Sequence, residues 1–277
     1  MTTATGSTVD TPPDLETGWE PTTPTDDTVL RHGVLAMAAA WQAISEGCGG
    51  RVHHDDGWEA VDLGRPTGLF NSATLTRPPR DADLGASVER IARFYDQRGH
   101  GAALLWSPWP TPDLSDRGWT LQGRPPLLYR PAGLPVERRP PADLELREVA
   151  SDRELTEWCR VAVEAFPLTE VDRPSGLLAP PILDDHRFRF VLARADGRSV
   201  AVGCQVVVRS TNVLLLSTVL PGHRGRGAYG ALVADRLARH PDLPSVTIVS
   251  DDSRPILTTR FGFLPISRWT LWERPRP

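Results

Sequence analysis

The chain has 277 residues, a length that suits one large or two small domains and permits a sizeable apolar core. Its formal net charge of −4 argues against nucleic acid as a partner, and no apolar run approaches the roughly 20 residues of a membrane-spanning helix, so no membrane contact is expected. All 31 basic residues are arginines, which excludes a P-loop lysine, a Schiff base to pyridoxal phosphate and a Ser-Lys dyad.

The first 130 residues predict a tail followed by a folded domain. Residues 1–27 are rich in Thr, Pro and Asp and show no secretory signal, so we expect a disordered tail and a cytoplasmic protein. Residues 28–130 predict helices over 29–45 and 84–98 and strands over 58–63, 70–75 and 102–106. The run His53-His54-Asp55-Asp56 lies among glycines and predicts a solvated loop; no metal is expected.

The proline-punctuated residues 131–143 predict a linker to a second domain, residues 144–277. Ser151 and Glu154 form a capping box at the start of a helix. The sequence further predicts strands over 144–149, 188–195, 200–209, 213–220, 246–250, 263–266 and 269–272, a helix that ends at Arg239, and a short helix over 255–260. The turns Asp196-Gly197 and Ser210-Thr211-Asn212 join three antiparallel strands, so we expect an α+β domain with one mostly antiparallel sheet.

The two halves end alike, which suggests an internal repeat. Gly118-Trp119 precedes Arg130, and Gly262-Phe263 precedes Arg274, with the same spacing of 12 residues from Gly to Arg. The offset between the halves is 144 residues. We therefore expect two tandem copies of one fold.

A glycine-rich segment follows the strand over 213–220 and precedes a helix. It contains G-x-G-x-x-G at Gly225, Gly227 and Gly230. One interpretation is a dinucleotide-binding unit, since Asp251 and Asp252 end the next strand. Only 25 residues follow Asp252, however, which is too few for a doubly wound sheet. A plain surface turn is another reading.

The favoured reading is an anion site built from main-chain amides. Glycines leave successive N–H groups unobstructed where a helix presents the positive end of its dipole. Arg224 and Arg226 add charged donors beside that helix start, which suits a diphosphate. On the helix itself we expect Asp235, Arg236 and Arg239 on the outer face.

The run Val219-x-Pro221-x-x-Arg224-Gly225-x-Gly227 resembles the acyl-CoA-binding signature of the GNAT acyltransferase superfamily, and the order of elements from 144 to 272 resembles that fold. The resemblance implies a mostly antiparallel central sheet flanked by helices, and a strand before the loop that splays from its parallel neighbour over 246–250. It also implies acetyl-CoA or another acyl-CoA as cosubstrate and a small-molecule or peptide amine as acceptor. The residues implied to bind the cosubstrate are Val219, Leu220, Arg224, Gly225, Arg226, Gly227, Ala228, Tyr229 and Gly230.

The sequence departs from the family pattern at three positions. Tyr229 stands where the family usually has Gly or Ala, so it faces the ligand or remodels the helix start. Thr258 stands where many members have a tyrosine acid, and the strand over 213–219 has no glutamate base, so Asp251 or a water wire is the candidate base. A non-catalytic CoA-binding sensor or scaffold module, as a monomer or homodimer, is the alternative to an N-acyltransferase.

The repeat offset also tests the first half. Arg224 corresponds to Arg80, Gly225 to Asp81 and Gly227 to Asp83. Carboxylates at an anion site repel a phosphate by several kcal/mol at intermediate dielectric. The first half is therefore expected to be a degenerate GNAT-like copy that binds no CoA and serves the structure or the substrate cleft.

Overall fold

The computed structural model describes residues 28–79, 81–97, 102–137, 140–166, 168 and 171–275, and the expected tail over 1–27 lies outside them. The helices are α1 (Val29–Gly47), α2 (Asp81–Asp96), α3 (Asp152–Ala165), α4 (Ala228–Leu237) and α5 (Arg254–Phe261), with short 3-10 turns that include η2 (Ser115–Arg117) and η5 (Pro221–His223). The strands are β1 (Arg51–Asp55), β2 (Trp58–Asp62), β3 (Asn71–Leu75), β4 (Ala103–Ser107), β5 (Thr120–Gly123), β6 (Pro126–Arg130), β7 (Leu144–Glu148), β8 (Phe188–Ala195), β9 (Arg198–Val208), β10 (Thr211–Val219), β11 (Ser245–Ile248), β12 (Leu264–Arg268) and β13 (Thr270–Arg274).

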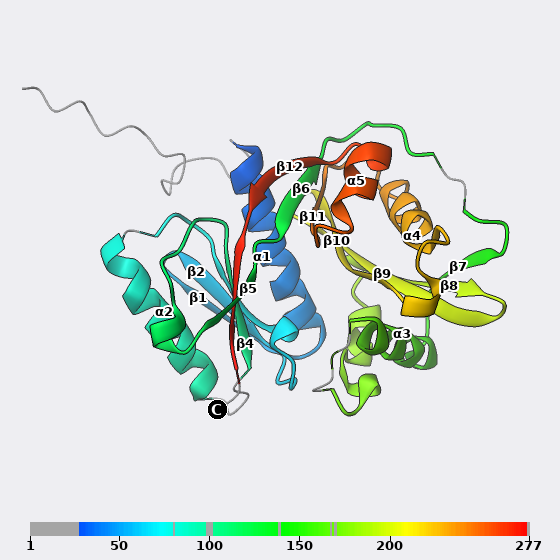
Figure 1. Ribbon diagram of the computed structural model, residues 1–277. Coiled ribbons are helices and arrows are strands. Elements are labelled where there is room, and N and C mark those ends of the chain that lie inside the picture. The colour runs from blue at the N-terminus through cyan, green and yellow to red at the C-terminus, as the bar shows by residue number, and fades with distance from the viewer. Residues whose placement is uncertain are drawn as a thin grey trace, which may run out of the picture.

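These strands form two mixed, mostly antiparallel sheets, so the protein is α+β (Figure 1). The first sheet has the order β1-β2-β3-β4-β13-β5, and the second has the order β12-β6-β11-β10-β9-β8-β7. Each contains one parallel pair within the described residues, β3 with β4 and β10 with β11. Helix α1 lies between the two sheets, where Met37, Trp41 and Ile44 join one apolar core with residues of both.

The sheets exchange one strand each. Strand β6 comes from the first half of the chain but lies between β11 and β12 of the second sheet, and β13, drawn in red, comes from the second half but lies between β4 and β5 of the first (Figure 1). The sheets therefore do not follow the expected segments 28–130 and 144–277, because one strand of each segment completes the other sheet.

The pairing of the exchanged strands repeats with the offset that the sequence predicts. In the second sheet Leu264 pairs with Tyr129, and in the first Thr120 pairs with Glu273, so each residue of one pair lies 144 positions from a residue of the other. A bulge interrupts both ladders at matching places, between Pro265 and Ser267 on β12 and opposite Leu271 on β13. The two halves are thus related by a pseudo-twofold axis, as expected for tandem copies.

Local chemistry places most of the predicted elements. The Ser151 hydroxyl accepts from the N–H of Glu154 at 3.4 Å, which confirms Ser151 as the N-cap of α3. The Glu154 carboxylate accepts from the N–H of Ala150 at 3.0 Å, one residue before the position that a capping box predicts. The expected turn over 210–212 is wrong, since Arg209 and Ser210 alone turn the chain with φ of 49° and 53° and Thr211 already belongs to β10.

The expected loop over His53-His54-Asp55-Asp56 is also wrong, although His53, His54 and Asp56 are exposed to solvent as expected. His53, His54 and Asp55 belong to β1, which pairs with β2. The His53 ring centroid lies 5.0 Å from that of Trp58 on the next strand and 5.3 Å from that of Phe94 on α2, so aromatic partners stabilise this strand. Within the described residues, no group of three or more His, Cys, Asp or Glu side chains is placed to hold a metal ion.

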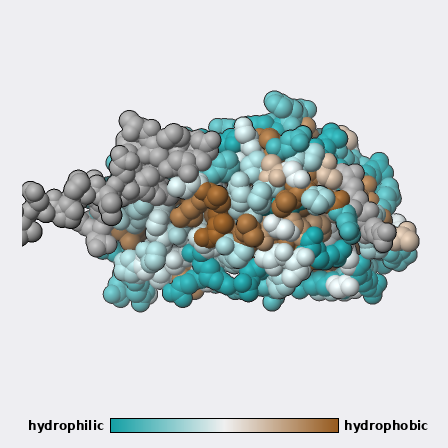
Figure 2. All heavy atoms as spheres, turned by 90° about the horizontal axis from the view of Figure 1, so that it is seen from above, coloured by the Kyte–Doolittle hydropathy of each residue, from teal (hydrophilic) through white to brown (hydrophobic). Residues whose placement is uncertain are grey.

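The surface is mostly hydrophilic, with apolar atoms gathered near the middle of the face seen from above (Figure 2). Among the described residues Leu264 on β12 is the most exposed large apolar side chain, at 55 %. It lies on an edge strand whose next residue, Pro265, has no N–H to offer a further strand. None of the described helices combines the length and apolar character that crossing a bilayer requires.

Candidate functional site

A gap opens between the two parallel strands of the second sheet. Strands β10 and β11 pair only at Asn212 with Ser245 and at Val213 with Val246 within the described residues, although β10 continues to Val219. Beyond those pairs the Thr247 hydroxyl, not a main-chain amide, donates to the carbonyl of Leu214 at 2.8 Å. The strands therefore separate toward their carboxyl ends, as the resemblance implies.

A β-bulge in β10 lies beside this gap. The register against β9 shifts between Leu215, which pairs with Cys204, and Thr218, which pairs with Val202. Leu216 has a φ of 49°, a left-handed conformation that is uncommon for a residue other than glycine. Such a bulge leaves main-chain groups outside the ladder, available to a ligand. Sequence reasoning missed it, because the run Leu214-Leu215-Leu216-Ser217 contains no glycine to mark the irregularity.

The glycine-rich loop joins the end of β10 to the start of α4. Gly225 and Gly227 have φ of 76° and 87°, which explains why glycine stands at both positions. Gly227 is the N-cap of α4, and the first helical hydrogen bond runs from the N–H of Ala231 to its carbonyl at 3.0 Å. The N–H groups of Ala228, Tyr229 and Gly230 thus have no acceptor within the helix and mark its positive end.

The two loop arginines differ in their surroundings. The Arg224 guanidinium donates to the carbonyls of Val219 at 3.2 Å and Ala165 at 3.4 Å, so it fastens the loop to β10 and to the end of α3. Arg226 is exposed and has no carboxylate partner among the described residues. Its charge is free to attract an anion, while Arg224 holds the loop in shape.

The main chain at Val219 and Leu220 is already bonded in the sheet. Val219 pairs with Ala201, and the N–H of Leu220 donates to the carbonyl of Val200 at 2.9 Å. With the Val219 carbonyl bonded to Arg224, few main-chain groups remain free at the end of the strand. The residues of β10 that have no partner in the ladder with β9 lie earlier, at Leu216 and Ser217.

Tyr229 turns into the protein. Its ring packs against two apolar clusters, one containing Leu232 and the other containing Phe261, and the helix start keeps its regular form. Burial raises the pKa of the Tyr229 phenol, and the charge of Arg236 and, to a smaller extent, Ser253 partly offset that rise. Gly230 is buried on the neighbouring face, where a Cβ would meet Arg260 and Ile256 at 3.5 Å, an ordinary contact.

The linker approaches the same loop. The Cγ of Pro141 lies 3.0 Å from the position that a Cβ on Gly227 would occupy. The N–H of Leu144, at the start of β7, donates to the carbonyl of Pro141 at 3.1 Å and so fixes this end of the linker. Gly227 is therefore required both by its φ and by the contact with Pro141.

The groups predicted to transfer protons are engaged elsewhere. Arg268 contacts both carboxylate oxygens of Asp251, at 2.7 and 3.1 Å, and these hydrogen bonds lower the pKa of Asp251. The Thr258 hydroxyl donates within its own helix to the carbonyls of Arg254 and Pro255, both at 3.2 Å. Catalysis by these two residues stays a prediction, and their contacts weigh against it.

The part of the first half that the structure describes has no comparable gap. Strands β3 and β4 pair at Ser72, Ala73 and Thr74, and β3 ends one residue later. Helix α2 begins at Asp81, so the connection is shorter than the one between β10 and α4. Asp83 is exposed in its first turn; Arg80, and the side chain of Asp81, lie outside the described part.

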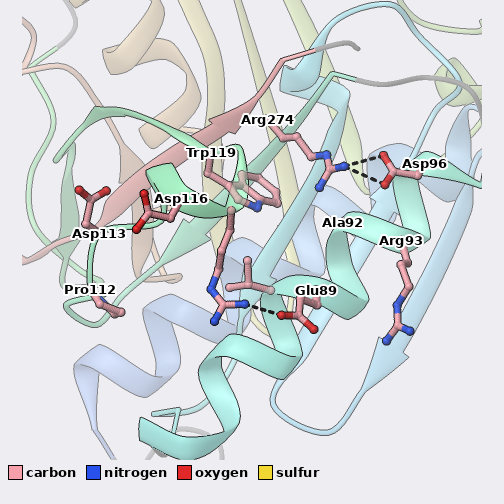
Figure 3. A pocket seen from close by; sticks show the side chains of 11 residues that line it. Glu89, Ala92, Arg93, Asp96, Pro112, Asp113, Asp116, Trp119 and Arg274 are labelled. Atoms are coloured by element: carbon pink, nitrogen blue, oxygen red, sulfur yellow. Dashed lines mark hydrogen bonds and ion pairs between the residues drawn. The ribbon is translucent and has the colours of Figure 1, made fainter.

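Two cavities lie beside the first sheet, away from the glycine-rich loop. They have volumes of about 800 and 530 Å³ and share Trp119, Pro112 and Asp113 in their walls. Ion pairs from Arg117 to Glu89 and from Arg274 to Asp96 cross the rim of the larger one (Figure 3). The space arises because the single turn η2 stands where the second half has α5, which packs Leu257 and Phe261 beside α4.

Solved structures provide the comparison. No protein-family model matches the sequence, and no curated protein is similar to it. A GCN5-related N-acetyltransferase from Kribbella flavida matches with a TM-score of 0.63 and 20% identity, over 87% of this chain and 96% of that one. A GCN5-related N-acetyltransferase from Sphaerobacter thermophilus has a TM-score of 0.53, 16% identity and coverage of 80% and 78%.

A third structure, a putative acetyltransferase of the GNAT family from Novosphingobium aromaticivorans DSM 12444, has a TM-score of 0.52 and 16% identity, with coverage of 84% and 97%. At these identities the likeness concerns the fold. Each match covers at least four fifths of this chain, so it includes both sheets. The chain therefore has the fold of the GNAT acetyltransferases.

Proposed function

We propose that this protein is an N-acyltransferase that moves an acetyl or other acyl group from acyl-CoA to an amine by direct attack. The observation that carries the proposal is the position of the glycine-rich loop, at the start of α4 and beside the gap between β10 and β11. Free amide donors at a helix start fit a diphosphate. An open strand gap with a bulge at Leu216 fits the thioester arm.

The chain's own groups would act by binding and orientation. The N–H groups of Ala228, Tyr229 and Gly230, with the exposed Arg226, would hold the diphosphate. Unpaired main-chain groups at Leu216 and Ser217 would hold the acyl group, and a donor there would stabilise negative charge on its oxygen. Acyl-CoA supplies a thioester whose thiolate, with a thiol pKa of about 8.5, leaves without an acid.

The reaction balances without another reactant. The amine nitrogen forms a bond to the acyl carbon, the carbon–sulfur bond breaks, and one proton passes from the amine to solvent. The acceptor, a small molecule or a peptide, must arrive as the free amine. This requirement places no demand on Asp251 or Thr258, in agreement with their hydrogen bonds.

The first test is binding followed by turnover. Acetyl-CoA or a longer acyl-CoA is expected to raise the melting temperature, because a ligand that binds only the folded state stabilises it. Thiol release from acyl-CoA is then measured with a panel of amines and peptides. Absence of a thermal shift with every acyl-CoA contradicts the proposal.

The second candidate is a CoA-binding module without catalysis. It is favoured by one observation, that Asp251 and Thr258 both have their hydrogen-bonding capacity engaged within the protein. This candidate expects a thermal shift without thiol release. Amine-dependent thiol release with any acceptor excludes it.

A further inference from the structure

Arg236 on α4 is fully buried, although the sequence predicts it on the outer face of the helix. The prediction is wrong because the guanidinium finds one main-chain acceptor within α4 and two on the strands beneath the helix. It donates to the carbonyls of Leu232 at 2.9 Å, Cys204 at 2.8 Å and Leu215 at 3.5 Å. Among the described residues no carboxylate forms an ion pair with it. Burial lowers its pKa to about 10.

The two strand acceptors, the carbonyls of Cys204 and Leu215, lie beside the bulge in β10. Leu215 is the last residue before the bulge, and Cys204 is its partner on β9. Gly203 on β9 lies directly against the guanidinium, since a Cβ at this position would lie 2.9 Å from the Cζ of Arg236. The guanidinium therefore occupies the space that Gly203 leaves on the face of the sheet toward α4.

A second contact joins the same helix to the beginning of β10. The Asn212 amide donates to the Arg236 carbonyl at 3.3 Å and to the Ser245 hydroxyl at 3.4 Å. Asn212 and Ser245 form one of the two pairs that keep β10 beside β11. Residue 236 thus binds β10 at two points, where the strand is paired with β11 and where it departs from it.

We propose that Arg236 is a positioning residue that fixes the bulge at Leu216 and Ser217 relative to the start of α4. The inference rests on the proposed function: α4 holds the diphosphate, the bulge holds the acyl group, and Arg236 sets the distance between them. Stability alone does not require an arginine here, because an apolar side chain of similar length fills the space without the cost of burying a charge.

The test separates positioning from stability. Arg236→Met keeps the length of the side chain and removes the donors, and Arg236→Lys keeps the charge with one nitrogen. Arg239→Met is the matched control, since Arg239 is exposed three residues further along the same segment. For Arg236→Met we expect kcat, counted per CoA-binding site, to fall about 10- to 100-fold, since small misplacements of reacting groups have effects of that size. The Kd for CoA without an acyl group should change less than about threefold, because α4 still presents its amides. Arg236→Lys should recover part of the loss.

Gly203→Ala provides a second route that keeps the arginine. Its Cβ displaces the guanidinium, so it should lower kcat in the same direction. In the Arg236→Met background the same substitution should have a smaller effect, which gives a measurable coupling in a double-mutant cycle. The single variant Gly203→Ala remains decisive if Arg236→Met fails to fold.

Hydrogen exchange of the unliganded protein keeps the inference separate from the proposed function. We expect the amides of Leu215–Thr218 to exchange faster in Arg236→Met and in Gly203→Ala than in the wild type and in Arg239→Met. If wild-type protein binds no acyl-CoA, the proposed function fails while this measurement still tests the role of Arg236. Unchanged exchange, or kcat per site within about twofold of wild type in both variants, overturns the inference.

Discussion

The backbone N–H of Trp269 donates to the carbonyl of Pro125 at 3.0 Å, and these two residues occupy equivalent positions in the two halves of the chain. Their neighbours repeat the relation, since the Arg268 guanidinium donates to the Arg124 carbonyl at 2.8 Å. Residues that face their own equivalents lie on the pseudo-twofold axis. From this crossing β6 and β13 run into opposite sheets, so neither sheet is complete without the other half.

The strand exchange predicts that core substitutions destabilise the half to which the strand has moved. Trp272 on β13 is 4% exposed and packs with Trp58, Ile91 and Trp119 of the first half. Trp272→Ala should lower the free energy of unfolding by about 3–5 kcal/mol. Hydrogen exchange should accelerate first in α2 and β4, although Trp272 belongs to the end of the chain.

The reciprocal substitution serves as the comparison. Leu128 on β6 is fully buried beside Leu257 and Phe261, so Leu128→Ala should accelerate exchange first in α4 and α5. Leu121→Ala is the surface control, at a residue that is 38% exposed, and should change the free energy of unfolding by no more than about 0.5 kcal/mol. Acceleration confined to the segment that carries each substitution would show that the halves do not share strands in solution.

Periodicity and repeat spacing predicted most of the elements, but they missed β1, β5 and β6 and did not predict the exchange. Apolar alternation over 188–195 matches β8, and the offset between Gly118 and Gly262 matches the register of the exchanged strands. Which sheet receives β6 or β13 depends on tertiary contacts of Leu128 and Trp272, and both residues fit either core by composition. The local alternation of apolar and polar residues therefore cannot predict the strand exchange.

The candidate site likewise combines features that the sequence signals with features that it does not. Glycines at 225 and 227 signal a left-handed loop, because their φ values have a simple sequence cause. The left-handed Leu216 and the buried Arg236 have no such signal, since each is stabilised by partners on other strands. The ion pair of Asp251 with Arg268 likewise depends on a strand that passes near it only in the folded protein.

Gly225 gives the sharpest test of the anion site. Nothing lies within 4 Å of a Cβ placed there, and both Asn and Asp tolerate its positive φ, so Gly225→Asn and Gly225→Asp differ mainly in charge. A carboxylate about 4 Å from a phosphate costs about 1–4 kcal/mol in water-like to intermediate surroundings. The Kd for acyl-CoA should therefore be at least about fivefold weaker for Asp than for Asn.

The difference should shrink as salt is added, because the loop is exposed and its charges are screened. Gly118→Asp is the control in the other half, at a glycine with φ of 78° and equally open surroundings. Calorimetric titration with acetyl-CoA measures all three variants. Equal affinity of the Asn and Asp variants for acetyl-CoA would show that the diphosphate does not bind at this loop.

The pH dependence of turnover should not reflect the ionisation of Asp251. Hydrogen bonds from Arg268 lower the pKa of Asp251 below its ordinary value near about 4, so it is a carboxylate throughout the neutral range and a weak base. Its stabilising effect is complete above that ordinary value and is lost only as the pH falls through the lowered pKa. Asp251→Asn should leave the pH profile of kcat unchanged between about pH 6 and 9, with the rate following the ionisation of the acceptor amine. Loss of the acidic limb in the Asn variant would identify Asp251 as the base after all.

One molecule of acyl-CoA should bind to each chain, although the fold is duplicated. The second half offers a gap between β10 and β11, whereas β3 and β4 stay paired to within a residue of the end of β3. The first half also carries Asp83 in the first turn of α2, where a carboxylate opposes a phosphate. Calorimetry of the wild type should give a stoichiometry near one, and Gly225→Asp should weaken that single site. A second site that survives Gly225→Asp would mean that the first half binds the carrier by other means, and that the loss of its glycines did not abolish binding.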